Sequence, residues 1–402
     1  MTVDSARHIR RMHWTLDPNV TFLNHGSFGA CPTLVRDKQR AIQDQLEREP
    51  VAFFLEAYPE LLAQTKRSVA QFLDAPSESI AMVRNTTEGV NAILSSIDWQ
   101  PEDEILVTNH TYPACAKAAH YARAVHGVKV RTLRIDPEWT DDEILAAFES
   151  ALSHRTRLAL MDHVTSATGL VLPAAGFVNA CRYAGVLSLI DGAHAPGMLE
   201  LSMAQLQPDF YVGNLHKWCC APKGSAFVYA AESKRTTLTP TSISHGYQVD
   251  KKDQDLAALF DWPGTFDPSA WLAVPTALEF MEMLHPDGLS ALREESIELR
   301  KRAESLIGTL VPMLSTVKGN RSWMRTFRLP PSTEPQSGPL EVDPFQRMLS
   351  HKHGIQVPVT YWASYPQRVM RISVAPYNTF TEYETLAHAL SDVLGAMNVS
   401  RQ

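Results

Sequence analysis

The sequence predicts an α/β fold, with a mainly parallel, doubly wound sheet in a large domain and a smaller α+β domain after it. Short apolar runs alternate with helical patterns through the first two thirds of the 402-residue chain, which is the order that builds parallel sheets. Polar motifs follow several of these runs directly, where a doubly wound sheet binds its ligands. After about residue 265 the alternation stops and longer amphipathic patterns follow.

The apolar runs of the first part are typical of buried parallel strands. They are short, rich in Val, Ile and Leu, and not cleanly alternating, as expected of strands that are covered on both faces. The segments between them carry apolar residues at helical spacing. We expect strands at 80–83, 104–108, 129–134, 158–163, 186–190, 210–212 and 226–229, and helices at 114–125, 141–152 and 173–184.

The last third of the chain predicts a smaller α+β domain. Its expected elements are helices at 269–284, 289–314, 344–353 and 382–397, a strand at 369–374, and an exposed proline-rich loop at 329–343. We therefore expect a large domain at 20–265 and a small domain formed by 1–19 together with 266–402.

Composition and charge exclude several classes of protein. With 45% hydrophobic and 20% charged residues the chain can bury a large core. Its net charge is −7 and its basic residues are dispersed, so neither nucleic acid nor a membrane is expected as a partner. No apolar run resembles a signal peptide or a membrane span. The five cysteines lack metal-ligand spacing, so we expect reduced thiols, no metal and a cytoplasmic protein.

The most informative residues are an aspartate and a lysine that each follow an apolar run. Asp191 ends one run, and Lys217 follows the next, directly after His216. A pyridoxal 5′-phosphate enzyme needs such a pair, because the lysine holds the cofactor in a Schiff base and the carboxylate keeps the pyridine nitrogen protonated. Taken alone, Asp191 could cap a helix and Lys217 could be a surface residue, and Lys223 is a rival that lacks a preceding histidine. We predict a pyridoxal-phosphate enzyme in which Lys217 is the nucleophile and, once freed, an acid–base group.

Eight short motifs lie in order along the chain and together carry a family resemblance. They are FLNHGSFGACP (22–32), NTTEG (85–89), NHTYPAC (109–115), HVTSATG (163–169), DGAH (191–194), HKW (216–218), WPGTFD (262–267) and RISVAPYN (371–378). From about residue 22 to about residue 390 the chain resembles the class V aminotransferase family, in particular its isopenicillin N epimerase-like and cysteine-desulfurase-like branch. The resemblance implies a fold type I pyridoxal-phosphate enzyme that acts on an amino-acid-like substrate.

The resemblance assigns several residues to the cofactor's phosphate. Thr86 and Thr87 match the phosphate-binding turn, where hydroxyls and the first amides of a helix converge, although this segment alone would be an ordinary helix cap. His216 is implied as a further phosphate contact. Thr265 matches a residue that reaches the phosphate of a neighbouring subunit, which implies a homodimer.

Other residues are matched to the cofactor ring and to the substrate. His110 corresponds to the aromatic residue that stacks on the ring, and Ser166 and His194 correspond to neighbours of its O3′ atom. Arg371 matches the arginine that binds the substrate α-carboxylate, which a planar guanidinium suits; alone, it could form a surface ion pair. Asn24 matches an N-terminal residue that lies over the active site.

Three reactions at the α-carbon of an external aldimine remain open. Epimerisation or racemisation, the leading interpretation, needs acid–base groups on both faces of the ring, for which Lys217 and either Tyr112 or His110 are candidates. Carbon–sulfur β-lysis of a cysteine conjugate or sulfoxide would use Tyr112 to protonate the leaving group. Transamination needs only Lys217. A cysteine desulfurase is not expected, because residues 354–371 hold no cysteine, and a non-catalytic module would have no need of Arg371.

Overall fold

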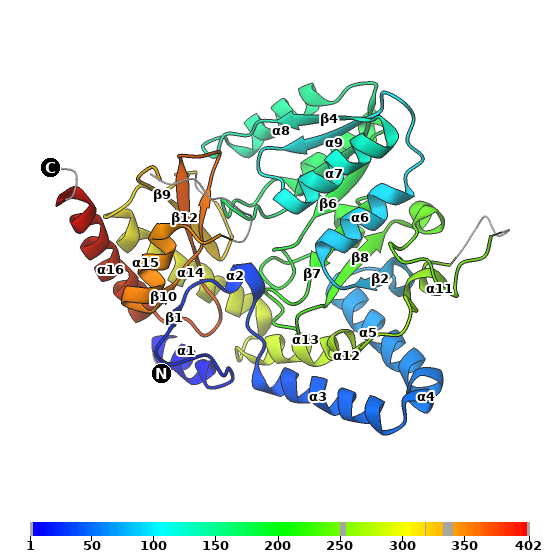
Figure 1. Ribbon diagram of the computed structural model, residues 1–402, viewed down its shortest axis with the longest axis horizontal. Coiled ribbons are helices and arrows are strands. Elements are labelled where there is room, and N and C mark those ends of the chain that lie inside the picture. The colour runs from blue at the N-terminus through cyan, green and yellow to red at the C-terminus, as the bar shows by residue number, and fades with distance from the viewer. Residues whose placement is uncertain (1–2, 250–254, 318, 333–340, 400–402) are drawn as a thin grey trace.

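In the computed structural model, a seven-stranded sheet with the order β2-β8-β7-β6-β5-β3-β4 forms the centre of the chain (Figure 1). The structure describes residues 3–249, 255–317, 319–332 and 341–399. The neighbouring strands β7, β6, β5, β3 and β4 run parallel to one another. In contrast, β8 is antiparallel to both of its neighbours, β7 and β2. The strands are β2 (Ile80–Val83), β3 (Glu104–Thr108), β4 (Lys129–Leu133), β5 (Thr156–Asp162), β6 (Leu187–Asp191), β7 (Phe210–Asn214) and β8 (Ala226–Ala230).

All seven expected strands are present, and the expectation of a mainly parallel sheet is confirmed. The antiparallel direction of β8 was not expected. Residues 215–225, which connect β7 to β8, contain no helix. The chain therefore turns back beside β7 instead of crossing over the sheet. This connection carries Lys217.

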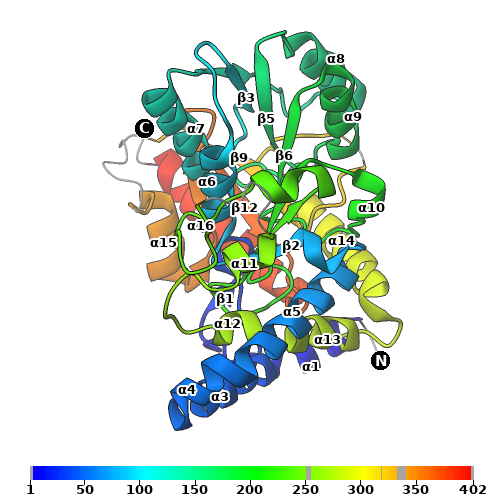
Figure 2. The ribbon, with the colours of Figure 1, turned by 90° about the vertical axis from the view of Figure 1, so that its right-hand side faces the viewer.

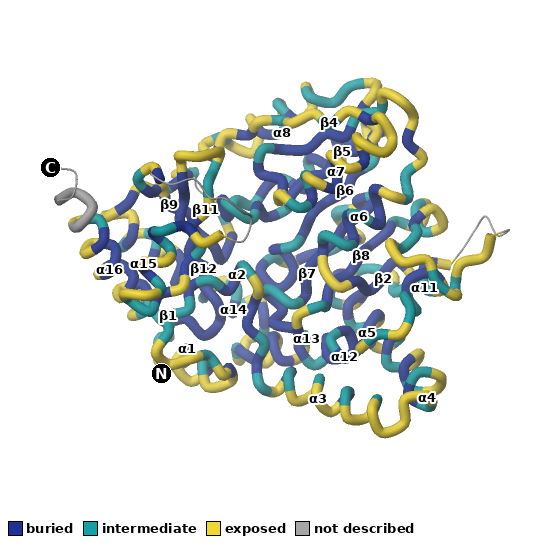
Figure 3. The backbone as a smooth tube through the Cα atoms, in the orientation of Figure 1, coloured by how far each residue is buried: buried dark blue, intermediate teal, exposed yellow. Residues whose placement is uncertain are grey.

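Alternate residues of each strand face opposite sides of the sheet, and each side has its own apolar core. In β5, Ala159 and Met161 pack with residues of α5 and α9, whereas Leu158 and Leu160 pack with residues of α6 and α7. Both faces are therefore buried at the centre of the sheet, where Figure 3 shows β6, β7 and β8 mostly in dark blue, whereas the edge strand β4 is largely exposed. The helices around the sheet are α5 (Tyr58–Phe72), α6 (Thr86–Ser96), α7 (Pro113–His126), α8 (Asp141–Ala151) and α9 (Ala174–Ala184).

A further group of helices packs below the sheet in Figure 1. The single helix expected at 269–284 is two, α12 (Ser269–Leu272) and α13 (Val274–Met283), because the chain breaks at Ala273 and a proline lies in the first turn of α13. Helix α13 packs against α5 and α3 (Thr33–Arg48). The sequence did not reveal α3, since only Val35 and Ile42 of its residues are buried and so sparse an apolar stripe is hard to recognise.

The C-terminal part has a three-stranded antiparallel sheet with the order β11-β12-β9. It packs among α14, α15 and α16, as Figure 2 shows from a second side. Helix α14 ends six residues before the expected end at 314, and residues 333–340 of the expected loop lie outside the described residues. The elements are β9 (Met324–Leu329), β11 (Val359–Tyr361), β12 (Arg368–Ser373), α14 (Gly288–Gly308), α15 (Pro344–His353) and α16 (Phe380–Val399).

The N-terminal segment lies against the C-terminal part (Figure 1). Strand β1 (Thr21–Phe22) pairs with β10 (Ile355–Gln356), and from α1 (Val3–Arg11) the buried Arg7 donates hydrogen bonds to the carbonyls of Ala375 and Asn378. The division into domains at 20 and 265 stays a prediction. The shorter helical segments are α2 (His25–Phe28), α4 (Pro50–Ala52), α10 (Met203–Leu206), α11 (Leu256–Phe260), the π-helix Phe53–Ala57, and the 3₁₀ turns Ser77–Ser79 and Glu232–Thr237.

Within the described ranges, no helix has both the length and the apolar character needed to cross a membrane.

Candidate active site

Most of the expected cofactor residues meet in one cavity of about 290 Å³ at the carboxyl ends of β5, β6 and β7. Ligands of parallel sheets bind at this edge. Segments far apart in the sequence complete the wall, including α2 and the start of α6. Of the expected site residues, the wall holds Thr86, Thr87, Tyr112, Ser166, Asp191, His194, His216 and Lys217.

The side chain of Lys217 is buried and hydrogen-bonded to a histidine. Its Nζ lies 3.0 Å from Nε2 of His194, and the indole N–H of Trp218 donates a hydrogen bond of 3.3 Å to Nδ1 of the same ring. Burial, and then the charge of Arg371, lower the pKa of Lys217 to about 8. Burial and the surrounding cations hold the pKa of His194 well below its usual range. The ring is therefore neutral, and the lysine is a usable nucleophile near neutral pH.

The backbone of the lysine segment is fixed by the N-terminal motif. Nε2 of His25 donates to the carbonyl of Lys217 at 2.9 Å, and Nδ1 lies 2.9 Å from the hydroxyl of Tyr377. Gly29 has a φ of 69°, and a Cβ at this position would lie 2.0 Å from the carbonyl oxygen of His216. Only glycine permits this approach, so the motif at 22–32 positions the lysine as well as the cavity wall.

Two buried carboxyl groups lie side by side at the ends of neighbouring strands. Asp162 of β5 is paired with Asp191 of β6, and each is 2% exposed. Asp191 accepts hydrogen bonds from the amide of Ala193 at 2.9 Å and from the thiol of Cys115 at 3.3 Å. Burial raises the pKa of Asp191, although these two hydrogen bonds and the charge of Lys217 act to lower it. Burial, and then the charge of Asp191, raise the pKa of Asp162 well above its usual range. Of the two carboxyl groups, Asp162 is therefore the one that more readily keeps a proton.

The start of α6 presents donors to the cavity. Asn85 caps the helix by accepting from the amide of Glu88 at 2.9 Å, and the amide of Thr86 donates to Oδ1 of Asn214 at 3.0 Å. The hydroxyl of Thr86 is buried and has no hydrogen-bond partner in the described part of the chain. An unpartnered buried hydroxyl costs about 1–3 kcal/mol, and at a helix start it suits an anion such as phosphate.

His216 lines the same cavity with a defined tautomer. Its Nδ1 lies 2.9 Å from the carbonyl of Ser225, so Nδ1 carries the proton of the neutral ring and Nε2 is bare. Burial, as the largest cause, lowers the pKa of His216 to about 4. A phosphate contact therefore requires that Nε2 gain a proton, which the negative charge of a phosphate favours.

Arg371 lies beside the cavity on β12 and is 5% exposed. It donates to the carbonyl of Ser166 and, at 3.4 Å, to the hydroxyl of Ser27, while its Nε has no partner among the described residues. Burial lowers the pKa of Arg371 to about 10, so it stays charged at neutral pH. The hydroxyl of Ser27 in turn donates to Oδ1 of Asn24 at 2.6 Å. Asn24 is therefore connected to Arg371 through Ser27 and does not itself line the cavity.

His110 lies apart from the cavity, in contrast to its expected place on the cofactor ring. Its Nδ1 is 2.8 Å from the hydroxyl of Thr168 and its Nε2 is 3.1 Å from the carbonyl of Ile135. Its ring packs against that of Trp362, with centroids 4.9 Å apart. Tyr112, two positions later, lines the cavity instead. The stacking and acid–base roles of His110 stay predictions, and of the two candidates for the second proton-transfer group Tyr112 is the one that lines the cavity.

Thr265 also lies away from Lys217. It lines a different cavity, together with Arg84 and Glu88. Within one chain it does not reach the residues expected at the cofactor. A contact with the cofactor of a neighbouring subunit is compatible with this position and stays a prediction.

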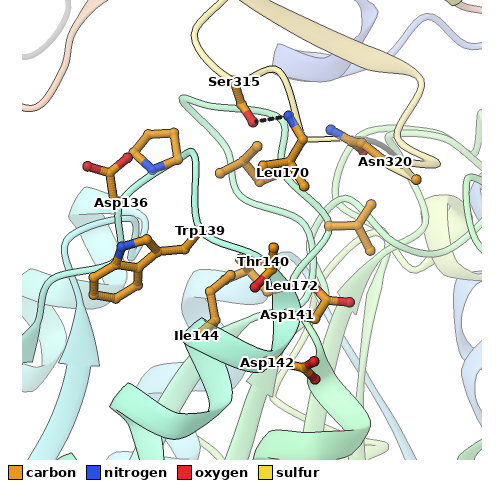
Figure 4. Close-up of a pocket in the computed structure, with 14 residues that line it drawn as sticks. Asp136, Trp139, Thr140, Asp141, Asp142, Ile144, Leu170, Leu172, Ser315 and Asn320 are labelled. Atoms are coloured by element: carbon orange, nitrogen blue, oxygen red, sulfur yellow. Dashed lines mark hydrogen bonds between the residues drawn. The ribbon is translucent and has the colours of Figure 1, made fainter.

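A second cavity, of about 400 Å³, lies between the start of α8 and the residues before β9 (Figure 4). Asp136, Asp141 and Asp142 line it together with Trp139. Asp141 and Asp142 belong to the first turn of α8, where negative charge complements the helix dipole. No lysine, histidine or cysteine is among the described lining residues, so this cavity is not a candidate for the reaction.

Comparison with known proteins identifies the family. The profile of Aminotransferase class-V matches residues 54–386. The chain belongs to this family. It is 33% identical to isopenicillin N epimerase of Streptomyces clavuligerus over 94% of this chain and 96% of that protein. It is 29% identical to hercynylcysteine sulfoxide lyase of Schizosaccharomyces pombe over 61% of this chain and 63% of that protein. A variant of C-DES, solved with glycine covalently linked to its PLP cofactor, matches with a TM-score of 0.80 and 22% identity, covering 95% of this chain and 99% of C-DES.

Membership of the class V family confirms three expectations. The chain has the fold type I architecture, it is an enzyme, and its cofactor is pyridoxal phosphate. The likeness to C-DES, at 22% identity, shows the fold alone. Because the relatives include both an epimerase and a lyase, the family does not decide the reaction.

In this class V chain, sequence reasoning missed four residues that position the site. Asp162 comes directly before the motif at 163–169 and follows an apolar run, which is the same pattern that identified Asp191, so this residue could have been found. His25 and Trp218 lie inside recognised motifs, but their partners are distant in the sequence. Asn214, which meets Thr86, likewise has no local pattern that reveals it.

Proposed function

We propose that the protein is an epimerase or racemase that removes and returns the α-proton of an amino-acid-like substrate. One observation carries the proposal: Lys217 and Tyr112, two groups able to transfer protons, line the same cavity. Inversion at a carbon needs both a proton acceptor and a proton donor. The similarity to isopenicillin N epimerase over nearly the whole chain supports this reaction.

The residues of the cavity fit pyridoxal phosphate. When bound, the cofactor supplies an electron-accepting ring that stabilises the negative charge left at the α-carbon. Lys217 would hold it covalently, and the ionised Asp191 would pair with the pyridine nitrogen. The unpartnered hydroxyl of Thr86 supports a phosphate at the start of α6, with Thr87 and His216 as further donors.

The ring's O3′ atom and the substrate carboxylate would be bound at the other end of the cavity. His194 is the stronger candidate for O3′, because its Nε2 already meets Nζ of Lys217 at 3.0 Å, and Ser166 is the second. Arg371 would bind the α-carboxylate, because its buried guanidinium keeps an unpartnered Nε. Ser27 and Asn24 hold the guanidinium in place through consecutive hydrogen bonds.

Proton transfer would be divided between the two groups. Lys217, whose pKa is lowered to about 8, accepts the α-proton as the free amine. Burial, followed by the nearby Cys115 and Asp191, raises the pKa of Tyr112, so its hydroxyl keeps a proton to donate. Return of a proton from Tyr112 gives the inverted centre, whereas return from Lys217 restores the original one.

A carbon–sulfur β-lyase is the second candidate. The protonated hydroxyl of Tyr112 favours it, since the same donor can protonate a sulfur leaving group. The similarity to hercynylcysteine sulfoxide lyase supports it as well. Transamination needs no such donor, and the absence of a cysteine at 354–371 argues against sulfur transfer by a desulfurase.

We further propose that the enzyme is a homodimer and works in the cytoplasm. The five cysteines are free thiols, which supports a reducing compartment. In the dimer, Thr265 of one subunit would reach the phosphate bound by the other. The test is to mix the variants Lys217→Ala and Thr265→Ala. Recovery of activity in hybrid dimers supports the shared site, because one of its two sites has both residues intact, and no recovery in demonstrably mixed dimers refutes it.

The reaction is tested by incubating the enzyme with L-amino acids and cysteine conjugates in deuterated water. Deuterium at the α-carbon together with inversion supports the epimerase. Release of a keto acid and ammonia identifies the lyase instead. The variant Tyr112→Phe should lose inversion but keep slow exchange of the α-proton through Lys217. Unchanged inversion in this variant contradicts the proposed donor.

A further inference from the structure

We propose that Trp218 fixes the ring of His194 in the tautomer that holds Lys217 as a neutral amine, and so sets the pH range in which Lys217 captures its cofactor. The inference rests on the proposed role of Lys217. It gives a positioning role to a tryptophan that has no part in the reaction described above.

The hydrogen bonds define the tautomer. An indole N–H can only donate, so Nδ1 of His194, which lies 3.3 Å from Nε1 of Trp218, must accept. The single proton of the neutral imidazole is therefore on Nε2. Nε2 lies 3.0 Å from Nζ of Lys217, so the lysine has to accept this hydrogen bond through a lone pair. An ammonium group has no lone pair, and the arrangement is complete only with the free amine.

The surroundings keep the histidine neutral. His194 is 1% exposed, and after burial its neighbours Lys217, Arg371 and His216 also lower its pKa. All three are basic and disfavour an imidazolium. Around Lys217 the balance is different, because negative charge on the Asp191–Asp162 pair favours the ammonium and opposes the effect of burial and Arg371. The hydrogen bond donated by His194 acts in favour of the amine.

Packing keeps the indole N–H aimed at the histidine. Trp218 is completely buried. Its ring meets Trp323 edge-on at a centroid distance of 5.6 Å and lies 5.0 Å from the ring of His25. His25 also holds the carbonyl of Lys217. The indole therefore cannot turn away without disturbing the segment that carries the lysine.

The consequence is chemical. In cofactor capture the lone pair of the Lys217 amine forms the new bond to the aldehyde carbon, and the two amine protons leave with the aldehyde oxygen as water. Without the indole donor, His194 could carry its proton on Nδ1 and offer Nε2 as an acceptor to an ammonium. The pKa of Lys217 would then rise towards its ordinary value, and capture would require a higher pH.

The first test compares Trp218→Phe with the matched control Trp323→Phe. Both remove a buried indole from the same cluster, but Nε1 of Trp323 has no hydrogen-bond partner among the described residues. The rate at which cofactor-free protein captures pyridoxal phosphate is measured against pH by absorbance and by trapping with borohydride. We expect the midpoint of the capture rate against pH to rise by at least about one pH unit in Trp218→Phe and to stay in place in Trp323→Phe. Below the midpoint, a shift of one pH unit makes capture about tenfold slower. An unmoved midpoint in a folded Trp218→Phe protein overturns the proposal.

The second test uses the wild-type protein and does not depend on whether the variant folds. Nitrogen-15 chemical shifts of labelled histidines report which ring nitrogen carries the proton, with His194→Gln to assign the signal. A protonated Nε2 and a bare Nδ1 support the proposal, whereas the opposite tautomer or an imidazolium overturns it. If wild-type protein captured no cofactor at all, the proposed role of Lys217 would fail, while the tautomer would still be decided by this measurement.

Discussion

The raised pKa of Asp162 predicts how the stability of the cofactor-free protein depends on pH. Burial, and then the charge of Asp191, raise the pKa of Asp162 in the folded protein, whereas an unfolded carboxyl group titrates near pH ~3.9. Between these two pKa values the folded state holds a proton that the unfolded state has released. The stabilisation is fully present below about pH 4 and falls by about 1.4 kcal/mol per pH unit as the pH rises towards the folded pKa.

The substitution Asp162→Asn removes this proton and keeps the shape of the neutral acid. As the pH rises from about 4 towards the folded pKa, the free energy of unfolding of the wild type should fall relative to the variant, by up to about 1.4 kcal/mol per pH unit. Urea unfolding of the cofactor-free proteins measures the difference, and Asp44→Asn, at an exposed position of α3, should follow the wild type. Parallel loss of stability in wild type and Asp162→Asn would refute the assignment of the proton to Asp162. Loss of the pH dependence only in Asp191→Asn would place that proton on Asp191.

Four further outcomes are expected at the same cavity. Lys217→Ala should lose the visible absorbance of the bound cofactor that borohydride removes, whereas Lys223→Ala should keep it. Thr86→Val deletes the unpartnered hydroxyl while Asn85 still caps the helix, so cofactor dissociation, measured by dialysis, should rise about tenfold with no loss of stability. Because Nε2 of His216 must gain a proton to contact a phosphate, cofactor binding should be accompanied by a proton uptake, and calorimetry should show that His216→Gln, with an amide donor, loses this uptake. Arg371→Lys should raise KM about tenfold or more with a smaller effect on kcat, because an ammonium cannot bind a carboxylate bidentately.

The strands and their order in the chain were predictable because each apolar run ends at a clear polar boundary. β2 and β3 have the expected bounds, as does α15. The direction of the strands was harder to predict from the sequence. β8 runs antiparallel to β7 because residues 215–225 form no helix that could cross over the sheet. The short strands β1 and β10 have no pattern of their own, and their pairing joins segments more than 300 residues apart.

The site shows the same limit at the level of single residues. Asp191 and Lys217 could be found because a strand end places them at the ligand-binding edge whatever surrounds them. The sequence could not decide between His110 and Tyr112, because both lie in the segment after β3. They differ in the folded chain, where His110 forms hydrogen bonds with Thr168 and Ile135. The contact of Trp218 with His194 depends on two segments that meet only in the folded chain.

The unpartnered polar atoms contain information about the ligand that the motifs do not. The hydroxyl of Thr86, Oδ2 of Asp162 and Nε of Arg371 are all buried without a hydrogen-bond partner in the described ranges. Each such atom costs about 1–3 kcal/mol or more unless a ligand satisfies it, and a ligand in this cavity would be placed to satisfy these three. Thr86 at a helix start suits a phosphate, and Arg371 suits a carboxylate. Asp162, the more readily protonated of the two carboxyl groups, would limit the negative charge beside a bound pyridine ring, and the charge on Asp191 would balance a protonated ring nitrogen.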